Sequence, residues 1–240
     1  MLEAGLYGLL GGSTLVVGAV VGCLLTLPRR FTGAVMALGA GVLIASVAYE
    51  LVGESAHDGT LAETSIGLAA GALVFFAGDV IITRGGGSQR KRSRGMAANS
   101  AAAALALGAL LDGIPESAAI GITSGGSAPS LAFLVAVALS NLPEGLSSSA
   151  GMRTSGHSIR SILALWTGIA LASGVAAAVG AGLVGGASAA ATAVVLSFAA
   201  GAILAMIAST MLPEASEEGG PVIGLATTAG FLAAVLLDQL

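Results

Sequence analysis

Two short motifs place carboxylates beside prolines inside long apolar stretches. The first is Asp112-Gly-Ile-Pro-Glu116, and the second, Ser140-Asn-Leu-Pro-Glu144, begins 28 residues later. A carboxylate at the centre of a bilayer costs about 2.5–3.5 kcal/mol on insertion scales. Each proline also removes the hydrogen bond to the carbonyl four residues before it, which leaves that oxygen available. Polar groups this unfavourable in lipid indicate a cation site at membrane depth.

The composition is that of a membrane protein. Apolar residues make up 55% of the chain and charged residues 9%, and the mean hydropathy is +0.96. The 37 glycines suit helices that pack closely in lipid. One cysteine excludes an internal disulfide and a Cys-rich zinc site. The first residues lack the basic region of a signal peptide, so we expect the first apolar stretch to be retained.

We predict eight transmembrane helices, one for each stretch of about 20 apolar residues. Helix is expected because a backbone in lipid must satisfy its own hydrogen bonds. The predicted spans are, in chain order, Gly5–Leu27, Phe31–Gly53, Thr64–Ile82, Ala98–Thr123, Ser130–Met152, Ile162–Val184, Ala189–Leu212 and Val222–Leu237. Together they form one all-α integral membrane domain over residues 1–240.

The basic residues predict the orientation. With the N-terminus outside, all nine Lys and Arg residues fall on one side of the eight spans, and cytoplasmic loops carry such an excess. The longest basic segment, residues 85–97, is predicted to be a solvated cytoplasmic loop rather than a nucleic-acid-binding segment. The expected location is the bacterial plasma (inner) membrane.

Segments far apart in the chain match each other. Residues 40–54 resemble residues 200–214 at a constant offset of 160, which aligns Glu54 with Glu214. The two segments are predicted to run in opposite directions through the membrane, as do the spans that hold the two Pro-Glu motifs. This pattern is typical of an inverted repeat. We predict that helices 1–3 and 6–8 form the repeat around helices 4 and 5.

The two central motifs supply the candidate ligands. Asp112 and Glu116 are four residues apart and share one helix face, as do Ser140 and Glu144. If the two faces meet, they offer three carboxylates, a hydroxyl and the amide of Asn141. A divalent cation offsets the repulsion between carboxylates, which a neutral solute cannot do. A proton-sharing structural network at a kinked interface is the alternative.

These motifs resemble those of the ZIP family of divalent-metal transporters. That family has eight membrane helices, with a His-Asn-x-Pro-Glu-Gly-type motif in the fourth and a related motif in the fifth. The resemblance implies that Glu116, Asn141 and Glu144 are transport-site ligands. The segment Met211-Leu-Pro-Glu214-Ala resembles the Pro-Glu-Ala ending of the family's seventh helix, which implies that Glu214 is a ligand on the exit path.

The chain departs from the family where the family has motif histidines or glutamine, because Asp112 and Ser140 stand there. Oxygen ligands suit Mn²⁺, Mg²⁺ or Ca²⁺ better than Zn²⁺, although affinity still rises toward the later metals. The sixth predicted span lacks the glutamate of many members, which favours a single site. The transported metal stays open among zinc, manganese, iron and similar ions, and we expect no cofactor.

Glu50 is the remaining candidate ligand. It lies inside the second predicted span, and two interpretations stay open. It faces the site or its outer entrance, or it only adds polarity to a helix interface. Asp79, near the end of the third predicted span, is expected to pair with Arg84, whose long side chain reaches the membrane surface.

The predicted function is secondary transport of a divalent metal cation toward the cytoplasm, with helices 4 and 5 rocking against the others. The sequence has no phosphate-binding P-loop motif and no catalytic constellation at membrane depth, so we expect neither ATP drive nor an enzyme. The alternative is a non-transporting membrane scaffold or metal sensor. The expected partners are the metal cation and the lipid bilayer, a homodimer is compatible with the sequence, and nucleic acid is not expected.

Overall fold

The computed structural model describes residues 1–25, 27–84, 98–124 and 128–237. Within these residues the chain is helical and forms no strand, as predicted. The side chains are described from residue 106 onward in the fifth helix. The predicted basic loop 85–97 lies outside the described residues, so its place relative to the membrane stays a prediction.

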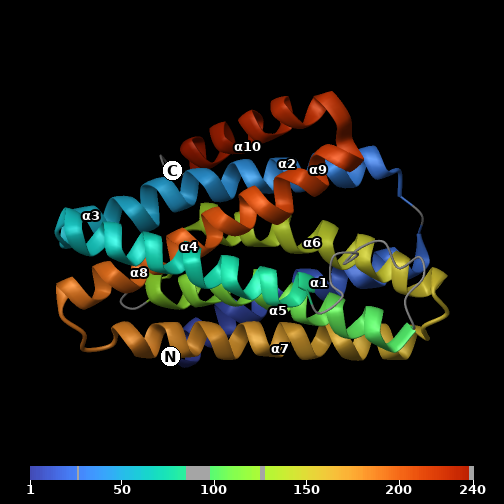
Figure 1. Ribbon diagram of the computed structural model, residues 1–240, viewed down its shortest axis with the longest axis horizontal. Coiled ribbons are helices and arrows are strands. Elements are labelled where there is room, and N and C mark those ends of the chain that lie inside the picture. Colours follow the sequence, from blue (N-terminus) through green and yellow to red (C-terminus); the bar gives the residue numbers. More distant parts are fainter. Residues whose placement is uncertain (26, 85–97, 125–127, 238–240) are drawn as a thin grey trace.

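Figure 1 shows the helices in chain order by colour. Their bounds are α1 Leu2–Leu24, α2 Arg29–Ser46, α3 Gly53–Asp58, α4 Leu61–Arg84, α5 Ala98–Thr123, α6 Leu131–Thr154, α7 Ile159–Val184, α8 Ala189–Met206, α9 Leu212–Gly219 and α10 Ile223–Leu237. Residues Val47–Val52 join α2 to α3 as a π-helix, and Ile207–Met211 join α8 to α9 in the same way. A short 3₁₀ turn, Gly220–Val222, reverses the chain between α9 and α10.

The protein is a multi-pass membrane protein by the length and apolar character of its helices. Six helical stretches of the described chain are long and apolar enough to cross a membrane. Large apolar side chains are exposed along α4 and α7, among them Leu73, Phe76, Val175 and Leu183. A contiguous apolar surface of this kind is rare on soluble proteins and is expected where helices face lipid.

This count does not confirm the eight predicted spans. Helix α5 is not among the six stretches, and the last two predicted spans fall within one continuous stretch, Ala189–Leu237. The side chains of α5 are described only from residue 106 onward, so the full apolar length of this helix does not enter the count.

Consecutive long helices run in alternate directions (Figure 1). The last residues of α1, α4, α6 and α9 therefore lie at the same end of the protein as the first residues of α2, α5 and α7, on the right of Figure 1. We call this the basic end, because the Lys and Arg residues of the described chain all lie in or next to these helix ends: Arg29, Arg30, Arg84, Arg153 and Arg160.

The contacts between helices divide them into two groups. Helices α1, α5, α6 and α7 pack chiefly against one another, and we call them the first group. In the second group, α2 packs on α10 and α9, and α4 packs on α8. The two groups meet mainly where α2 lies on α6 and where α5 lies on α8. The predicted helices 4 and 5 correspond to α5 and α6. They do not stand apart from the other helices as expected, because α6 packs extensively on α1 and α5 packs extensively on α7.

Glycines allow the helices of the second group to touch through their backbones. Gly41 of α2 lies directly against the carbonyl of Thr227 in α10, and Gly201 of α8 lies against the carbonyl of Leu68 in α4. A Cβ atom at either glycine would collide with that carbonyl oxygen. Contacts through small residues are the usual means of close helix packing in lipid, where the hydrophobic effect gives no preference for helix over lipid.

The two π-helices each insert extra backbone into a long helix. At the second of them, the N–H of Leu212 donates to the carbonyl of Ile207, five residues earlier. Each π-helical turn therefore changes which side chains of the following helix face inward. Short π-helical turns are frequent at functional sites, and the second one here leads directly into Pro213 and Glu214.

Candidate metal-binding cavity

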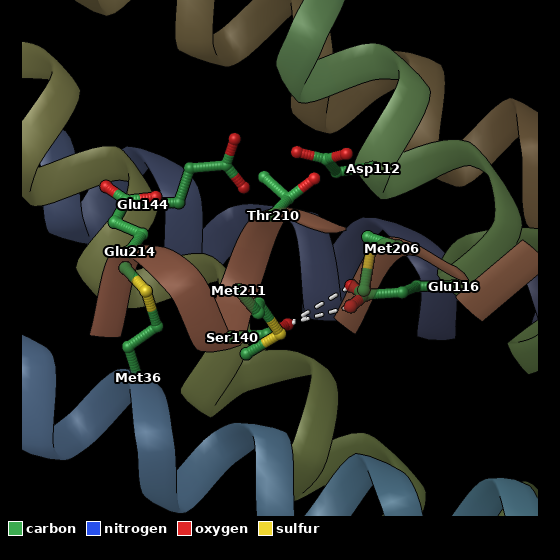
Figure 2. A pocket seen from close by; sticks show the side chains of 9 residues that line it. All are labelled: Met36, Asp112, Glu116, Ser140, Glu144, Met206, Thr210, Met211 and Glu214. Carbon is green, nitrogen blue, oxygen red and sulfur yellow. Dashed lines mark hydrogen bonds between the residues drawn. The ribbon is translucent and has the colours of Figure 1, made fainter. Parts of the chain in front are cut away.

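A small cavity lies where the two helix groups meet (Figure 2). The volume open to the centre of a water-sized sphere is about 20 Å³, which is enough for roughly one water molecule or one ion. Nine described residues line it: Met36, Asp112, Glu116, Ser140, Glu144, Met206, Thr210, Met211 and Glu214. Four of these carry carboxylates, and none of them is a Lys, Arg or His residue.

The first group of helices supplies most of the acids. Helix α5 contributes Asp112 and Glu116 from one face, and α6 contributes Ser140 and Glu144 from one face. The spacing of four residues in each motif predicted these shared faces, and the fold brings the two faces to one cavity. Asp112 and Glu116 are buried, with 8% and 2% of their surface exposed.

Ser140 and Glu116 form the polar contact between α5 and α6. The Ser140 hydroxyl lies 3.1 Å from each carboxylate oxygen of Glu116 and also 3.0 Å from the carbonyl of Val137. A hydroxyl has one hydrogen to donate, so these contacts share it. Ser140 therefore holds the Glu116 carboxylate at the wall of the cavity (Figure 2).

The four carboxylates are spread along the cavity. In Figure 2 the carboxylates of Glu214 and Glu116 lie farthest apart, and those of Glu144 and Asp112 lie between them. Among the described residues, no group of three or more His, Cys, Asp or Glu side chains is close enough to hold a metal ion. A cation bound here without rearrangement therefore takes its remaining ligands from other side chains, from backbone carbonyls or from water.

Asn141 does not line this cavity. Its side chain is buried, and Nδ2 donates to the carbonyl of Gly11 in α1 at 3.2 Å. In this arrangement the amide links α6 to α1 within the first group. Its neighbour Ser140 points into the cavity instead, because adjacent residues of a helix project in different directions.

Glu50 lies in a different part of the molecule. It accepts a hydrogen bond of 2.6 Å from Ser130, the residue that caps the start of α6. Together with Glu54 and His57 it lines an open depression of about 520 Å³. This depression lies at the end of the protein opposite the basic end, where α3 ends and α6 begins.

Four lining residues were missed from the sequence: Thr210 and the methionines Met36, Met206 and Met211. Thr210 matches Glu50 at the offset of 160, so the repeat carried a signal that pointed to it. The methionines carried no such signal, since an apolar residue in an apolar helix is expected to face lipid or core.

No protein-family model matches this chain, and no curated protein matches it. The resemblance to the ZIP family thus depends on the three short Pro-Glu motifs and on the eight-span topology predicted from the sequence.

Proposed function

We propose that this protein is a secondary transporter that carries a divalent metal cation across the membrane toward the cytoplasm, in the manner of the ZIP family. One observation carries the proposal: a cavity inside a multi-pass membrane protein is lined by four carboxylates and, among its described lining residues, by no basic side chain. Ionisable residues in membrane segments usually mark an ion or substrate path. A cation is the cargo that compensates this negative charge.

The proposed topology is eight transmembrane helices with an inverted repeat. Features of the backbone support it, because the π-helices begin at Val47 and Ile207, at the same offset of 160 as the sequence match. The glycines that pack against carbonyls, Gly41 and Gly201, share this offset. Their contact residues, Thr227 for Gly41 and Leu68 for Gly201, are 159 positions apart. Matched backbone features in antiparallel helices are what two inverted copies of one unit produce.

The arrangement of the two helix groups supports alternating access. The cavity lies between the groups, with Asp112 and Glu116 on the first group and Glu214 on the second. A displacement of one group relative to the other would therefore open the cavity toward either side of the membrane. In this mechanism α5 and α6, the predicted helices 4 and 5, do not rock alone. Helices α1 and α7 pack against them and move with them.

The structure has the features of a state open toward the basic end. Glu144 and Glu214 are partly exposed, whereas Glu116 is buried deeper in the protein. Toward the opposite end, Phe133 and Val137 of α6 are at most 1% exposed. These apolar residues lie along α6 between the cavity and the depression that holds Glu50. We propose that the basic end faces the cytoplasm of a bacterial cell, in accord with the positive-inside rule.

Metal uptake into proteoliposomes tests the proposal. Wild type is compared with Glu116→Gln and Glu144→Gln, which remove a negative charge from the cavity and keep the side-chain size. Asp79→Asn is the matched control, because it removes the same charge outside the cavity lining. We expect uptake of Zn²⁺ or Mn²⁺ to fall by at least about tenfold in both cavity variants and to stay near wild type in the control.

Two outcomes would contradict the proposal. Uptake at the wild-type rate in both cavity variants would show that the cavity is not the transport site. Metal binding that depends on the cavity acids, without any uptake by wild type, would instead support the metal-sensor alternative.

A further inference from the structure

We infer that Met36, Met206 and Met211 are ligands of the transported cation, and that the cavity therefore selects a thiophilic late d-block cation over Mg²⁺ and Ca²⁺. The inference rests on the proposed transport function, and it names the cargo class of the same cavity. It reverses the preference for hard cations that oxygen ligands alone predicted.

Methionines are concentrated at this cavity. Three of the six methionines in the chain line it. Met152, by contrast, is buried in a separate apolar cluster with Leu15, Ile162 and Trp166. These three methionines also belong to the large apolar core, whose other members are mainly alanine, leucine, isoleucine and valine, so the thioether side chains of that core all gather at the acids.

The methionines lie beside the polar groups of the cavity (Figure 2). Met206 lies next to Glu116, Met211 next to Ser140, and Met36 near Glu214. On both sides of the cavity, a thioether therefore lies beside a carboxylate or a hydroxyl. This mixed arrangement can supply a cation where three carboxylates do not come together.

The π-helix brings two of these methionines to the same cavity. Met206 and Met211 are five residues apart, and a regular α-helix with 3.6 residues per turn would point them in clearly different directions. The residues between them, Ile207–Met211, are π-helical, and π-helical hydrogen bonds join residues five apart. This local geometry therefore places both thioethers on the cavity side, together with Thr210.

The chemistry of the thioether then decides the cargo class. Sulfur of methionine is a soft and neutral donor, which binds late d-block cations and adds little for Mg²⁺ or Ca²⁺. Around any position in the cavity, a cation has fewer than three described carboxylates within reach, and the hydroxyl and thioether groups of the lining are the remaining side chains placed to complete its shell. Mg²⁺ or Ca²⁺ gains nothing from the thioether groups of this set, whereas a cation such as Cd²⁺ binds both the thioether groups and the oxygen groups.

X-ray absorption on the wild-type protein loaded with Cd²⁺ tests the inference without any substitution. We expect a first shell that contains sulfur as well as oxygen. The single cysteine, Cys23, does not line the cavity, and a Cys23→Ser variant should keep the sulfur signal. A first shell of oxygen alone would overturn the assignment of methionine ligands.

Substitution of leucine for methionine tests selectivity, because leucine nearly conserves volume and removes the sulfur. We expect Met206→Leu and Met211→Leu to lower the binding of Cd²⁺ relative to Mn²⁺ by about tenfold or more, as loss of a metal ligand does. Met152→Leu is the matched control and should leave the ratio unchanged. An unchanged ratio in the cavity variants would overturn the inference while leaving metal transport intact. Failure of wild type to bind or carry any divalent cation would overturn the proposed function as well.

Discussion

Ser140 and Asn141 are neighbours in the chain, yet their side chains serve different parts of the molecule. Ser140 donates to the Glu116 carboxylate inside the cavity, whereas Asn141 donates to the carbonyl of Gly11 on α1. The resemblance to the ZIP family implies a ligand role for Asn141, and its position here favours a role in holding α1 to α6. The two roles differ in what the loss of the amide would change.

Replacement of Asn141 by alanine separates these roles. We expect Asn141→Ala to lower the free energy of unfolding by about 1 kcal/mol, because one buried hydrogen bond is lost. The affinity for Cd²⁺ or Mn²⁺ should stay within about twofold of wild type, since the amide lies outside the cavity; loss of a ligand would cost far more. Thermal unfolding in detergent and metal titration of the same sample measure both quantities. Lost affinity together with unchanged stability would support the ligand role instead.

At the scale of the helix, glycine contacts and π-helical turns position the lining side chains. The glycines let α2 approach α10 and let α8 approach α4 through their backbones. The π-helices then set which residues face the cavity at one end and the depression at the other. The glycines act only through geometry, whereas the π-helices also contribute lining residues, Glu50 to the depression and Met211 to the cavity.

Alanine substitutions at glycine measure this contribution. Gly41→Ala and Gly201→Ala should lower the free energy of unfolding by about 1–3 kcal/mol, because the new methyl group meets a backbone carbonyl that cannot move alone. Gly168→Ala in α7 is the matched control. No atom outside its own helix lies near the position of its Cβ, so this change should be neutral or stabilising by up to about 1 kcal/mol. Equal effects at all three positions would contradict the packing argument.

At the scale of the whole molecule, the cavity, the depression and the basic end lie along one direction through the helix bundle. Glu214 lines the cavity from α9, which ends at the basic end, and Glu54 lines the depression at the opposite end. The two glutamates are also the matched residues of the predicted repeat. Apolar residues between the two openings separate them in this state.

Labelling of introduced cysteines tests the orientation. In a Cys23→Ser background, Thr154→Cys places a thiol at the basic end, and Ala187→Cys places one at the opposite end. Both positions are exposed and lie at opposite ends of α7. In intact cells, we expect a membrane-impermeant thiol reagent to label Ala187→Cys at once and Thr154→Cys only after permeabilisation. Labelling of both from the same side would contradict the topology.

The sequence by itself determined the class of protein and the residues with unusual chemistry. Helix formation and membrane character follow from the apolar content of stretches of about 20 residues, which is a local property. The pairing of Asp112 with Glu116, and of Ser140 with Glu144, follows from the spacing of one helical turn. Tertiary packing changes neither the length of an apolar stretch nor the angle between residues four apart, so both could be predicted.

Only the tertiary structure decided which faces meet, because that depends on contacts between helices far apart in the chain. It separated Glu50 from the cavity, turned Asn141 toward Gly11 and brought four acids from three helices to one small cavity. It also placed Met206 and Met211 beside those acids through a π-helical turn that residue composition does not reveal. The methionines that packing adds to the cavity are apolar in sequence terms, which is why hydropathy and motif spacing pointed only to the polar residues of the motifs.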